Sequence, residues 1–441
     1  MEISLMQILE AREKRVQMQD RLLRDYGLPL LSFTMNIPGP IKTSPLIQRG
    51  FLAGCRALDC RLPKAWVRYR EINRADTGWE AFYVLDAPAL EVKKITAAIE
   101  DHHGLGRLFD MDVLDTDHRK LDRSLVGGKS RDCIVCGAPG RDCAASRAHT
   151  VPQLQEAVRS ILLSWCRRED ARRIGAWAVQ SLTDEVCTTP KPGLVDCLGS
   201  GSHRDMDLFT FSASAAALSP YFTRCAELGI ETRKQEPGET FALLRQEGLR
   251  AEEQMYEATG GVNTHKGAIF TMGVLCGAAG RLWDPVELPK PEQFFPEVAA
   301  MTSRAMEEDF RRLGTDTPGG RLYHARGLRG IRGQAAAGLP AIRDIGLPVY
   351  RACTEKGMGK NEAGVTVLLH LIAQVEDTNM AARGGPSGAA EGAALARRYL
   401  EKAPDEAALS ELCRVFQAHN WSPGGCADLL AGVYFLSHFE V

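Results

Sequence analysis

Two aspartates separated by one residue, Asp110 and Asp112, are the sharpest candidate for chemistry in the first half of the chain. Residues 107–114 alternate apolar and polar side chains, which predicts a β-strand with both carboxylates on one face. Two carboxylates at that spacing can hold Mg²⁺ against a triphosphate during in-line transfer. Because Asp-x-Asp is a common pattern, a solvated pair of acids at a strand end is the alternative interpretation.

A cluster of soft metal ligands follows this strand: Cys133-x-x-Cys136, then Cys143 and His149. Thiolate and imidazole are the groups that a structural Zn²⁺ site uses, so the cluster predicts a possible zinc site. Its spacing differs from that of common zinc modules. Buried or loosely placed thiols near a turn are the alternative.

The loop at residues 127–131 reads Gly-Gly-Lys-Ser-Arg and could hold a phosphate group with Lys129 and Arg131. It lacks the spacing of the second glycine and the lysine that defines a P-loop. The loop is therefore a weak signal when it is taken alone.

Polar, glycine-rich islands separate long apolar segments in the second half of the chain. Ligand-binding residues concentrate in loops of this kind, because a rigid scaffold positions them. We therefore expect the islands to form a binding site. They lie at residues 188–196, 201–207, 260–267, 375–385 and 420–425.

Residues 366–379 read as one apolar helix in which His370, Gln374 and Asp377 recur at i, i+4 and i+7. A polar stripe on such a helix must be satisfied by partners or by a ligand. A single solvated face is the alternative.

Asp428 is a carboxylate within a second apolar helix, which begins just after Gly424 and Gly425. The N-terminus of a helix that starts with glycine is a natural phosphate site. A buried acid beside it suggests a metal ion or a hydrogen-bond network, although a satisfied core aspartate is equally compatible with the pattern.

The elements that must position these residues differ between the two halves. In the first half, apolar residues at helical intervals predict a helix near the start, and residues 30–37 predict a strand that ends at Pro38-Gly39-Pro40. Residues 66–72 and 79–85 flank a polar turn, as an antiparallel pair does. Pro88 is expected to open a further helix, which Gly104 closes.

From about residue 151 onward, β-branched runs give way to Ala-, Leu-, Glu- and Arg-rich segments, which predict an all-helical domain. A charged stretch at residues 165–173 is expected to join the last helix of one domain to the first helix of the next. We therefore expect an α/β domain with a mixed sheet, like that of nucleotidyltransferases, at residues 1–166, and an all-α domain at residues 167–441.

Composition limits the possible partners. The formal net charge is −2, with no polybasic arm, which gives no sign of a nucleic-acid or membrane-surface binder. The first residues run directly into a charged segment, and the longest apolar stretch is too short to span a bilayer, so no membrane span is expected. Thirteen cysteines, scattered without framework spacing, favour a cytoplasmic protein with reduced thiols.

The islands of the second half together resemble the triphosphoribosyl-dephospho-CoA synthase family, and the first half resembles the apo-citrate lyase phosphoribosyl-dephospho-CoA transferase family. The motifs of the second half are Thr-Pro-Lys-Pro-Gly-Leu-Val-Asp at 189–196, Ser-His-Arg-Asp-Met at 202–206, Asn-Thr-His-Lys-Gly at 263–267, Glu-Asp-Thr-Asn at 376–379 with Arg-Gly-Gly at 383–385, and Ser-Pro-Gly-Gly-Cys-Ala-Asp at 422–428. Those of the first half are Arg-Glu-Lys-Arg at 12–15, the segment 31–42 with its Asn-Ile-Pro-Gly-Pro, Asp-Met-Asp at 110–112, and Ser-Arg-Asp-Cys-Ile-Val-Cys at 130–136.

This resemblance implies two consecutive reactions. The synthase joins ATP to dephospho-CoA, whose 2′-hydroxyl displaces adenine. The transferase moves the product to a serine of the citrate lyase acyl-carrier (gamma) subunit and expels pyrophosphate. The implied partners are therefore small nucleotides and that carrier subunit, and the implied metal ion is Mg²⁺.

The resemblance also implies roles for particular residues. In the synthase half, adenine displacement needs acids and proton carriers near the sugar and cations for the triphosphate. The catalytic candidates are Asp110 and Asp112 in the transferase half and His203, Asp205, Glu376 and Asp377 in the synthase half, with His265 as a further proton carrier. The candidates for binding nucleotide and phosphate are Arg12, Arg15, Lys129, Arg131, Lys191, Lys266, Arg383, Gly384, Gly385, Gly424 and Gly425. The candidate Mg²⁺ ligands are Asp110, Asp112, Asp205, Asp207, Asp377 and Asp428.

Two other functions remain open at this point. The second half could be a hydrolase that cleaves an N-glycosidic bond with water, since an all-helical domain with clustered acids would look similar. The first half could be a non-catalytic module that docks the carrier protein.

Overall fold

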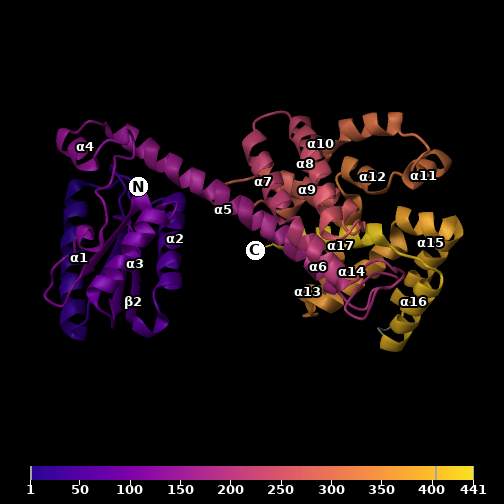
Figure 1. Cartoon of the computed structure of the whole chain (residues 1–441), viewed down its shortest axis with the longest axis horizontal. Coiled ribbons are helices and arrows are strands. Elements are labelled where there is room, and N and C mark those ends of the chain that lie inside the picture. The colour runs from indigo at the N-terminus through magenta and orange to yellow at the C-terminus, as the bar shows by residue number, and fades with distance from the viewer. Residues whose placement is uncertain (1, 403–404, 441) are drawn as a thin grey trace. The chain divides into compact units, whose positions relative to one another are not determined.

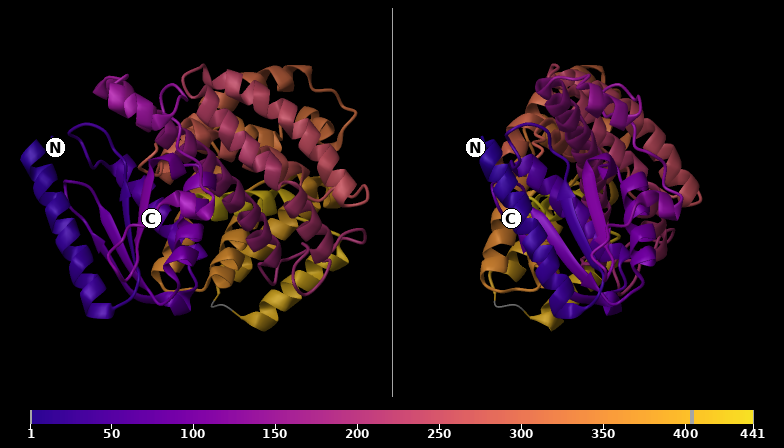
Figure 2. Two further views of the ribbon diagram at one scale, coloured as in Figure 1. Left: turned by 60° about the vertical axis from the view of Figure 1, so that its left-hand side comes forward. Right: turned by 90° about the vertical axis from the view of Figure 1, so that its left-hand side faces the viewer.

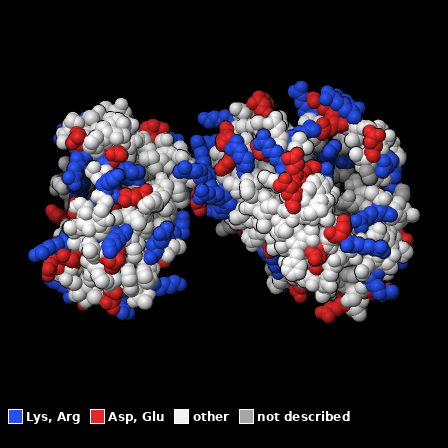
Figure 3. Space-filling view, in the orientation of Figure 1, with Lys and Arg blue, Asp and Glu red and all other residues white. Residues whose placement is uncertain are grey.

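The computed structural model describes residues 2–402 and 405–440, and the chain divides into two compact units, residues 1–167 and 168–441. Figure 1 shows the elements of each unit. No helix among the described residues is long and apolar enough to cross a membrane. On the visible face of each unit, basic and acidic side chains are interspersed (Figure 3), as the small net charge leads one to expect.

The first unit is built on a four-stranded sheet with the order β2-β3-β1-β4. Its strands pair antiparallel throughout, so the expected mixed sheet is wrong in strand direction, although the combination of sheet and helices is confirmed. The predicted hairpin is confirmed as β2 and β3. The regular elements are α1 (Leu5–Tyr26), β1 (Leu30–Met35), α2 (Pro45–Arg61), β2 (Val67–Asn73), β3 (Glu80–Leu85), α3 (Ala89–His102), β4 (Phe109–Leu114) and α4 (Gly140–Ser146), with short 3₁₀ turns at Lys64–Trp66, Gly106–Leu108 and Arg123–Val126.

Each face of this sheet packs against different helices because side chains alternate along a strand. Leu22 and Leu23 of α1 pack on Leu30 of β1 and its neighbours on one face, and the left view of Figure 2 shows α1 beside the sheet. On the other face, the ring of Phe51 from α2 stacks on Phe33 with 4.8 Å between ring centroids.

The edge strand β4 carries the two aspartates as predicted. Its buried residues alternate with half-buried ones, and the aspartates occupy the half-buried positions. Asp110 is in register with Thr34 of β1. Across the outer edge, Glu100 of α3 accepts a hydrogen bond from Met111 N at 2.9 Å, which satisfies a backbone group that an edge strand would otherwise expose.

The second unit is helical, and the part that the structure describes contains only an isolated bridge between Asp196 and Gly199 in place of strands. Helix α5 (Val151–Cys187) runs without a break through residues 165–173, so one helix of 37 residues stands where two joined helices were expected. The other helices are α6 (Leu208–Ala217), α7 (Ser219–Thr232), α8 (Pro237–Ala258), α9 (Lys266–Arg281), α10 (Pro291–Arg312), α11 (Pro318–Arg326), α12 (Gly330–Ala336), a π-helical turn (Ala341–Gly346), α13 (Leu347–Glu355), α14 (Lys360–Gln374), α15 (Thr378–Leu400), α16 (Glu406–Ala418) and α17 (Gly424–Ser437).

Helix α9 forms the centre of this unit. It is buried on nearly all sides, which explains its apolar sequence, and it packs against α7, α8, α10 and α17. The backbones of α7 and α9 approach closely at Gly229 and Gly280, where a methyl group on either residue would collide with the other helix. This close packing helps to fix the position of α9, whose N-terminus carries candidate site residues.

Candidate active sites

In the first unit, a cavity of about 150 Å³ contains Asp110, together with Arg12 and Arg15 from α1 and Lys42 from the loop after β1. Burial and then the neighbouring Asp112 raise the pKa of Asp110 above its usual value. Burial and then Arg12 lower the pKa of Lys42. A carboxylate facing three cations suits a site for a phosphorylated ligand and a divalent ion.

Asp112 points to the same face of the sheet but does not line this cavity. Its Oδ2 lies 2.5 Å from Nζ of Lys120, which occupies the position of a counter-ion. Arg15 is held by Glu80, whose Oε1 lies 2.6 Å from its Nη2. The cavity therefore combines positioned cations with one carboxylate, and the second acid lies beside it.

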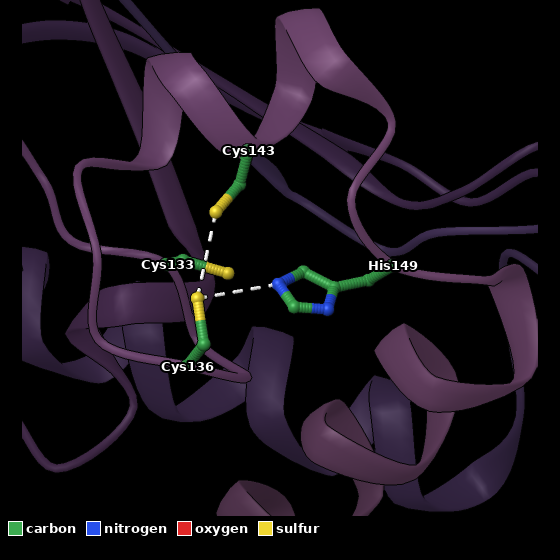
Figure 4. Close-up of side chains that lie close together, drawn as sticks. All are labelled: Cys133, Cys136, Cys143 and His149. Carbon is green, nitrogen blue, oxygen red and sulfur yellow. Dashed lines mark hydrogen bonds between the residues drawn. The ribbon is translucent and has the colours of Figure 1, made fainter.

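The four predicted zinc ligands converge in space (Figure 4). Their ligand atoms all lie within 4.8 Å of one another, with Sγ of Cys136 3.5 Å from Sγ of Cys143 and 3.3 Å from Nε2 of His149. A tetrahedral Zn²⁺ bonded to sulfur at about 2.3 Å separates its ligand atoms by about 3.7 Å. Gly137, at φ 75°, closes the turn that brings Cys133 and Cys136 to one side.

A second cavity of the first unit, about 1090 Å³, adjoins these cysteines and contains Arg131. The guanidinium of Arg131 donates a hydrogen bond to Phe109 O at 2.8 Å and pairs with Glu100 at 2.5 Å. Lys129 is exposed and does not line either cavity. The glycine-rich loop is thus placed near the cysteine cluster rather than beside Asp110.

In the second unit, the first turns of three helices line one cavity of about 430 Å³. These helices are α9, α15 and α17, which begin at Lys266, Thr378 and Gly424. Helix N-termini present unpaired backbone N–H groups and the positive end of the helix dipole, so their convergence favours a polyanion. The islands that are far apart in the sequence therefore meet in one site.

The cations of this cavity are held in different ways. Lys191 is buried, and its Nζ lies 2.5 Å from Oε1 of Glu185, a buried acid of α5. Lys266 is more exposed and pairs with Glu252 of α8 at 2.8 Å. Arg383 Nη1 donates a hydrogen bond to Ser202 O at 3.1 Å.

His203 links two predicted phosphate-binding segments. Arg383 Nη2 donates to His203 Nδ1 at 3.2 Å, so Nε2 carries the proton that is donated to Ser422 Oγ at 2.9 Å. Burial and then Arg383 lower the pKa of His203 to about 4, so the ring is neutral near pH 7. This geometry positions Arg383 and Ser422 around the cavity.

His265 presents a nitrogen that has no hydrogen-bond partner in the part of the chain that the structure describes. Thr264 Oγ1 donates to Ser214 Oγ at 2.8 Å, and Ser214 Oγ lies 2.7 Å from His265 Nδ1. This relay makes Nδ1 the acceptor, so buried Nε2 carries the proton. Burial and then Lys191 lower the pKa of His265 to about 3, which keeps a neutral N–H donor beside the cavity.

Asp428 lines the same cavity, together with Asp205. Burial, then Glu185 and Asp377, raise the pKa of Asp428 well above its usual value. A methyl group at Gly267 would collide with the Asp428 carboxylate, so glycine is needed for this acid to reach the N-terminus of α9.

Asp377 joins two helices instead of lying on the surface of one. The predicted single helix at residues 366–379 is wrong, because α14 ends at Gln374 and Asp377 caps α15. Its Oδ1 accepts from Asn379 N at 2.8 Å and Met380 N at 3.0 Å, and its Oδ2 accepts from Cys426 N at 2.8 Å. Burial raises the pKa of Asp377, and these three donors act in the opposite direction.

Some of the remaining candidates line the cavity of about 430 Å³, and others lie outside it. Asp207 caps the N-terminus of α6, where its Oδ1 accepts from Thr210 N at 2.9 Å, and it does not line the cavity. Gly384 packs on the indole of Trp421, and Gly385 forms a kink in α15 at φ 69°. Glu376 and Asp377 line a neighbouring cavity, whereas Gly424 and Gly425 line the cavity of about 430 Å³.

Comparison with known proteins accounts for both units. A family model described as ATP:dephospho-CoA triphosphoribosyl transferase (CitG) matches residues 171–441, and one described as apo-citrate lyase phosphoribosyl-dephospho-CoA transferase (CitX) matches residues 3–165. "Protein CitXG" of Haemophilus influenzae is 32% identical, over 99% of this chain and 96% of that protein. The chain belongs to the CitXG family.

Further relatives support this assignment. "Protein CitXG" of Leuconostoc mesenteroides is 29% identical over 99% of this chain and 97% of its own length. The 2-(5''-triphosphoribosyl)-3'-dephosphocoenzyme-A synthase of Pectobacterium atrosepticum is 38% identical, over 64% of this chain and 94% of its own length. As a CitXG protein, the chain is a bifunctional transferase of citrate lyase prosthetic-group biosynthesis. The hydrolase and docking-module alternatives are not favoured.

Three residues that line or contact the candidate sites were missed by sequence reasoning. Lys42 lies within the Asn-Ile-Pro-Gly-Pro-Ile-Lys segment, so its motif already indicated a role. Glu185 precedes the first island on an otherwise apolar helix face, which was a usable signal for a buried acid. Ser214 sits in an alanine-rich helix and gave no signal, because only its contact with His265 reveals it.

Proposed function

We propose that the second unit makes triphosphoribosyl-dephospho-CoA from ATP and dephospho-CoA with release of adenine. We propose further that the first unit transfers this product to a serine of the citrate lyase acyl-carrier subunit. The observation that carries the first assignment is the cavity at which the N-termini of α9, α15 and α17 converge with Lys191 and Asp428. The family descriptions name the substrates.

The synthase step forms a bond between the 2′-oxygen of dephospho-CoA and C1′ of the ATP ribose, and it breaks the bond from C1′ to adenine. Positive charge develops on the ribose, and Asp428 and Asp205 can stabilise it at the cavity wall. The neutral Nε2–H of His265 can donate a hydrogen bond to the departing adenine, and adenine takes up the proton that the 2′-hydroxyl loses, so the step balances. Lys191, Lys266 and Arg383 bind the triphosphate.

The transferase step forms a phosphodiester bond between the carrier serine and the phosphate next to the ribose, and pyrophosphate leaves. Arg12, Arg15 and Lys42 can bind the phosphates, and Asp110 lies among them. Mg²⁺ would neutralise phosphate charge in both units when bound. Asp110, with Asp112 beside the cavity, would hold it in the first unit, and Asp205 would hold it in the second.

We place the protein in the cytoplasm, because all thirteen cysteines are free and a reducing compartment keeps them so. ATP and dephospho-CoA are also small cytoplasmic metabolites in this proposal.

The whole function is tested by incubating the protein with ATP, dephospho-CoA, Mg²⁺ and the apo carrier subunit, and then measuring the intact mass of that subunit. We expect the mass of the carrier to increase by that of the prosthetic group. Adenine should be released from ATP only when dephospho-CoA is present. Adenine release from ATP alone would instead indicate hydrolysis and overturn the synthase assignment.

We also propose that Cys133, Cys136, Cys143 and His149 hold one structural Zn²⁺, because their four ligand atoms lie within 4.8 Å of one another and are of the types that such a site uses. Replacing Cys136 with serine is expected to remove zinc and to lower the melting temperature of the first unit by on the order of 10 °C, since structural zinc supplies folding free energy. Elemental analysis and thermal unfolding measure both effects.

The control for this variant is Cys60→Ser, which changes an exposed thiol of α2. It should keep both the zinc and the melting temperature. If metal-free wild-type protein keeps its melting temperature and its transferase activity, the zinc proposal is wrong.

A further inference from the structure

A second cavity in the helical unit, of about 620 Å³, is not used in the mechanism above. It lies between α12, the π-helical turn at Ala341–Gly346, and the starts of α15 and α17. It is larger than the cavity of about 430 Å³ that contains the phosphate-binding groups. Both volumes fall in the range of small-molecule sites, which is about 300–1,000 Å³.

The two cavities adjoin each other. Ile331, Thr378 and Gly425 line both of them. Gly425 has no side chain to separate the cavities, and a Cβ atom there would lie 2.9 Å from Oδ2 of Asp377. Asp377 in turn holds the first turns of α15 and α17 together through its three backbone donors. The boundary between the cavities is therefore a fixed structure built from two helix starts.

The chemistry of the two walls differs. The first cavity contains Lys191, Lys266 and Arg383 and suits a triphosphate. The wall of the second combines aliphatic residues, among them Ile345 and Leu429, with uncharged polar ones such as Gln334. Such a wall suits a long ligand of low charge density.

One cation, Arg329, lines the second cavity. Its Nη2 lies 2.7 Å from Glu307, and its guanidinium lies 4.5 Å from the ring centroid of Phe310. Three acids, Asp344, Glu376 and Asp377, also line it. Asp344 and Glu376 pair with Arg343 and Arg326, and Asp377 accepts three backbone hydrogen bonds. Arg329 is the cation of this lining that a diphosphate could meet, and the three acids disfavour a more highly charged triphosphate.

We propose that the second cavity binds dephospho-CoA while the first binds ATP, so that the two ribose rings meet at Ile331, Thr378 and Gly425. This inference rests on the function proposed above. The pantetheine arm of dephospho-CoA is long and uncharged, which matches the aliphatic wall, and its diphosphate can reach Arg329. The acceptor hydroxyl of dephospho-CoA then reaches C1′ of ATP at this junction, where displacement requires it to approach from the face opposite to adenine.

Ala337→Trp tests this assignment, because Ala337 lines only the second cavity and its exposed position at the end of α12 leaves room for the larger side chain to enter it. We expect the Kd for dephospho-CoA, measured by equilibrium dialysis with labelled ligand, to rise by about tenfold or more. The Kd for ATP should stay within about twofold. Ala390→Trp, at an exposed position of α15 that lines neither cavity, should change neither value.

A second variant, Ile345→Glu, places an acid in the opposite wall and should have the same selective effect if the tryptophan variant does not fold. The reciprocal variant Lys266→Ala should raise the Kd for ATP alone. The assignment is overturned if Ala337→Trp or Ile345→Glu weakens ATP binding instead, or if both folded variants bind dephospho-CoA as tightly as the wild type does. Binding is measured without turnover, so these outcomes are separate from a failure of the wild type to release adenine, which would overturn the proposed function.

Discussion

Asp110→Asn is expected to lower the rate of carrier modification by a factor on the order of 10² to 10³, with adenine release unchanged. Asparagine keeps the shape of the side chain but removes the only carboxylate that lines the described cavity with Arg12, Arg15 and Lys42. Without that negative charge, a divalent ion and the triphosphate are no longer held for attack by the carrier serine. The measurement is the initial rate at which the mass of the carrier increases.

The thermal stability of Asp110→Asn should not fall with its transferase activity. Burial and Asp112 raise the pKa of Asp110 in the folded protein, so the folded state binds its proton more tightly than the unfolded state does. The free energy of unfolding of the wild type therefore falls as the pH rises from the ordinary carboxyl pKa through the raised pKa of Asp110. The asparagine variant has no carboxyl group at this position, so it does not lose this stability. Its melting temperature at pH 7, measured with a metal chelator, should equal or exceed that of the wild type.

The matched control is Asp86→Asn, which alters an exposed acid that pairs with Arg68 at 2.6 Å. A surface pair of this kind contributes at most about 1 kcal/mol, so both activities should persist. If Asp110→Asn stopped adenine release and spared carrier modification, the assignment of reactions to the two units would be reversed.

Asp428→Asn is expected to lower adenine release by a factor on the order of 10³, because it removes the carboxyl group at the wall of the cavity where charge develops on the ribose. Asparagine is nearly isosteric, so it should still fit against Gly267. Transfer of preformed triphosphoribosyl-dephospho-CoA to the carrier should be unchanged. Both rates can be followed by product masses.

Asp284→Asn is the control for this variant. Asp284 is exposed, and its Oδ1 accepts from Val286 N at 2.8 Å, outside the cavities of the helical unit. Its adenine release should match that of the wild type. If folded Asp428→Asn protein lost both activities, the two sites would not be independent.

Much of the fold could be predicted from residue patterns. The alternation around Asp110 predicted β4 and the shared face of both aspartates, because side chains of a strand alternate whatever surrounds it. The predicted direction of strand pairing was wrong, because that direction depends on how the connections between strands return along the sheet. The break between α14 and α15 was also missed, because a capping aspartate inside an apolar run looks like part of a helix face.

The sequence alone determined the two families, the Asp-x-Asp strand and the cysteine and histidine cluster, since each of these is carried by local spacing or by a motif. Only the tertiary structure decided which distant residues share a cavity. It brought Asp205, His265 and Asp428 together, placed Glu376 in the neighbouring cavity, and left Asp207 as a helix cap. The physical reason is that packing around α9 determines where the N-termini of α9, α15 and α17 meet, and no local pattern encodes that meeting point.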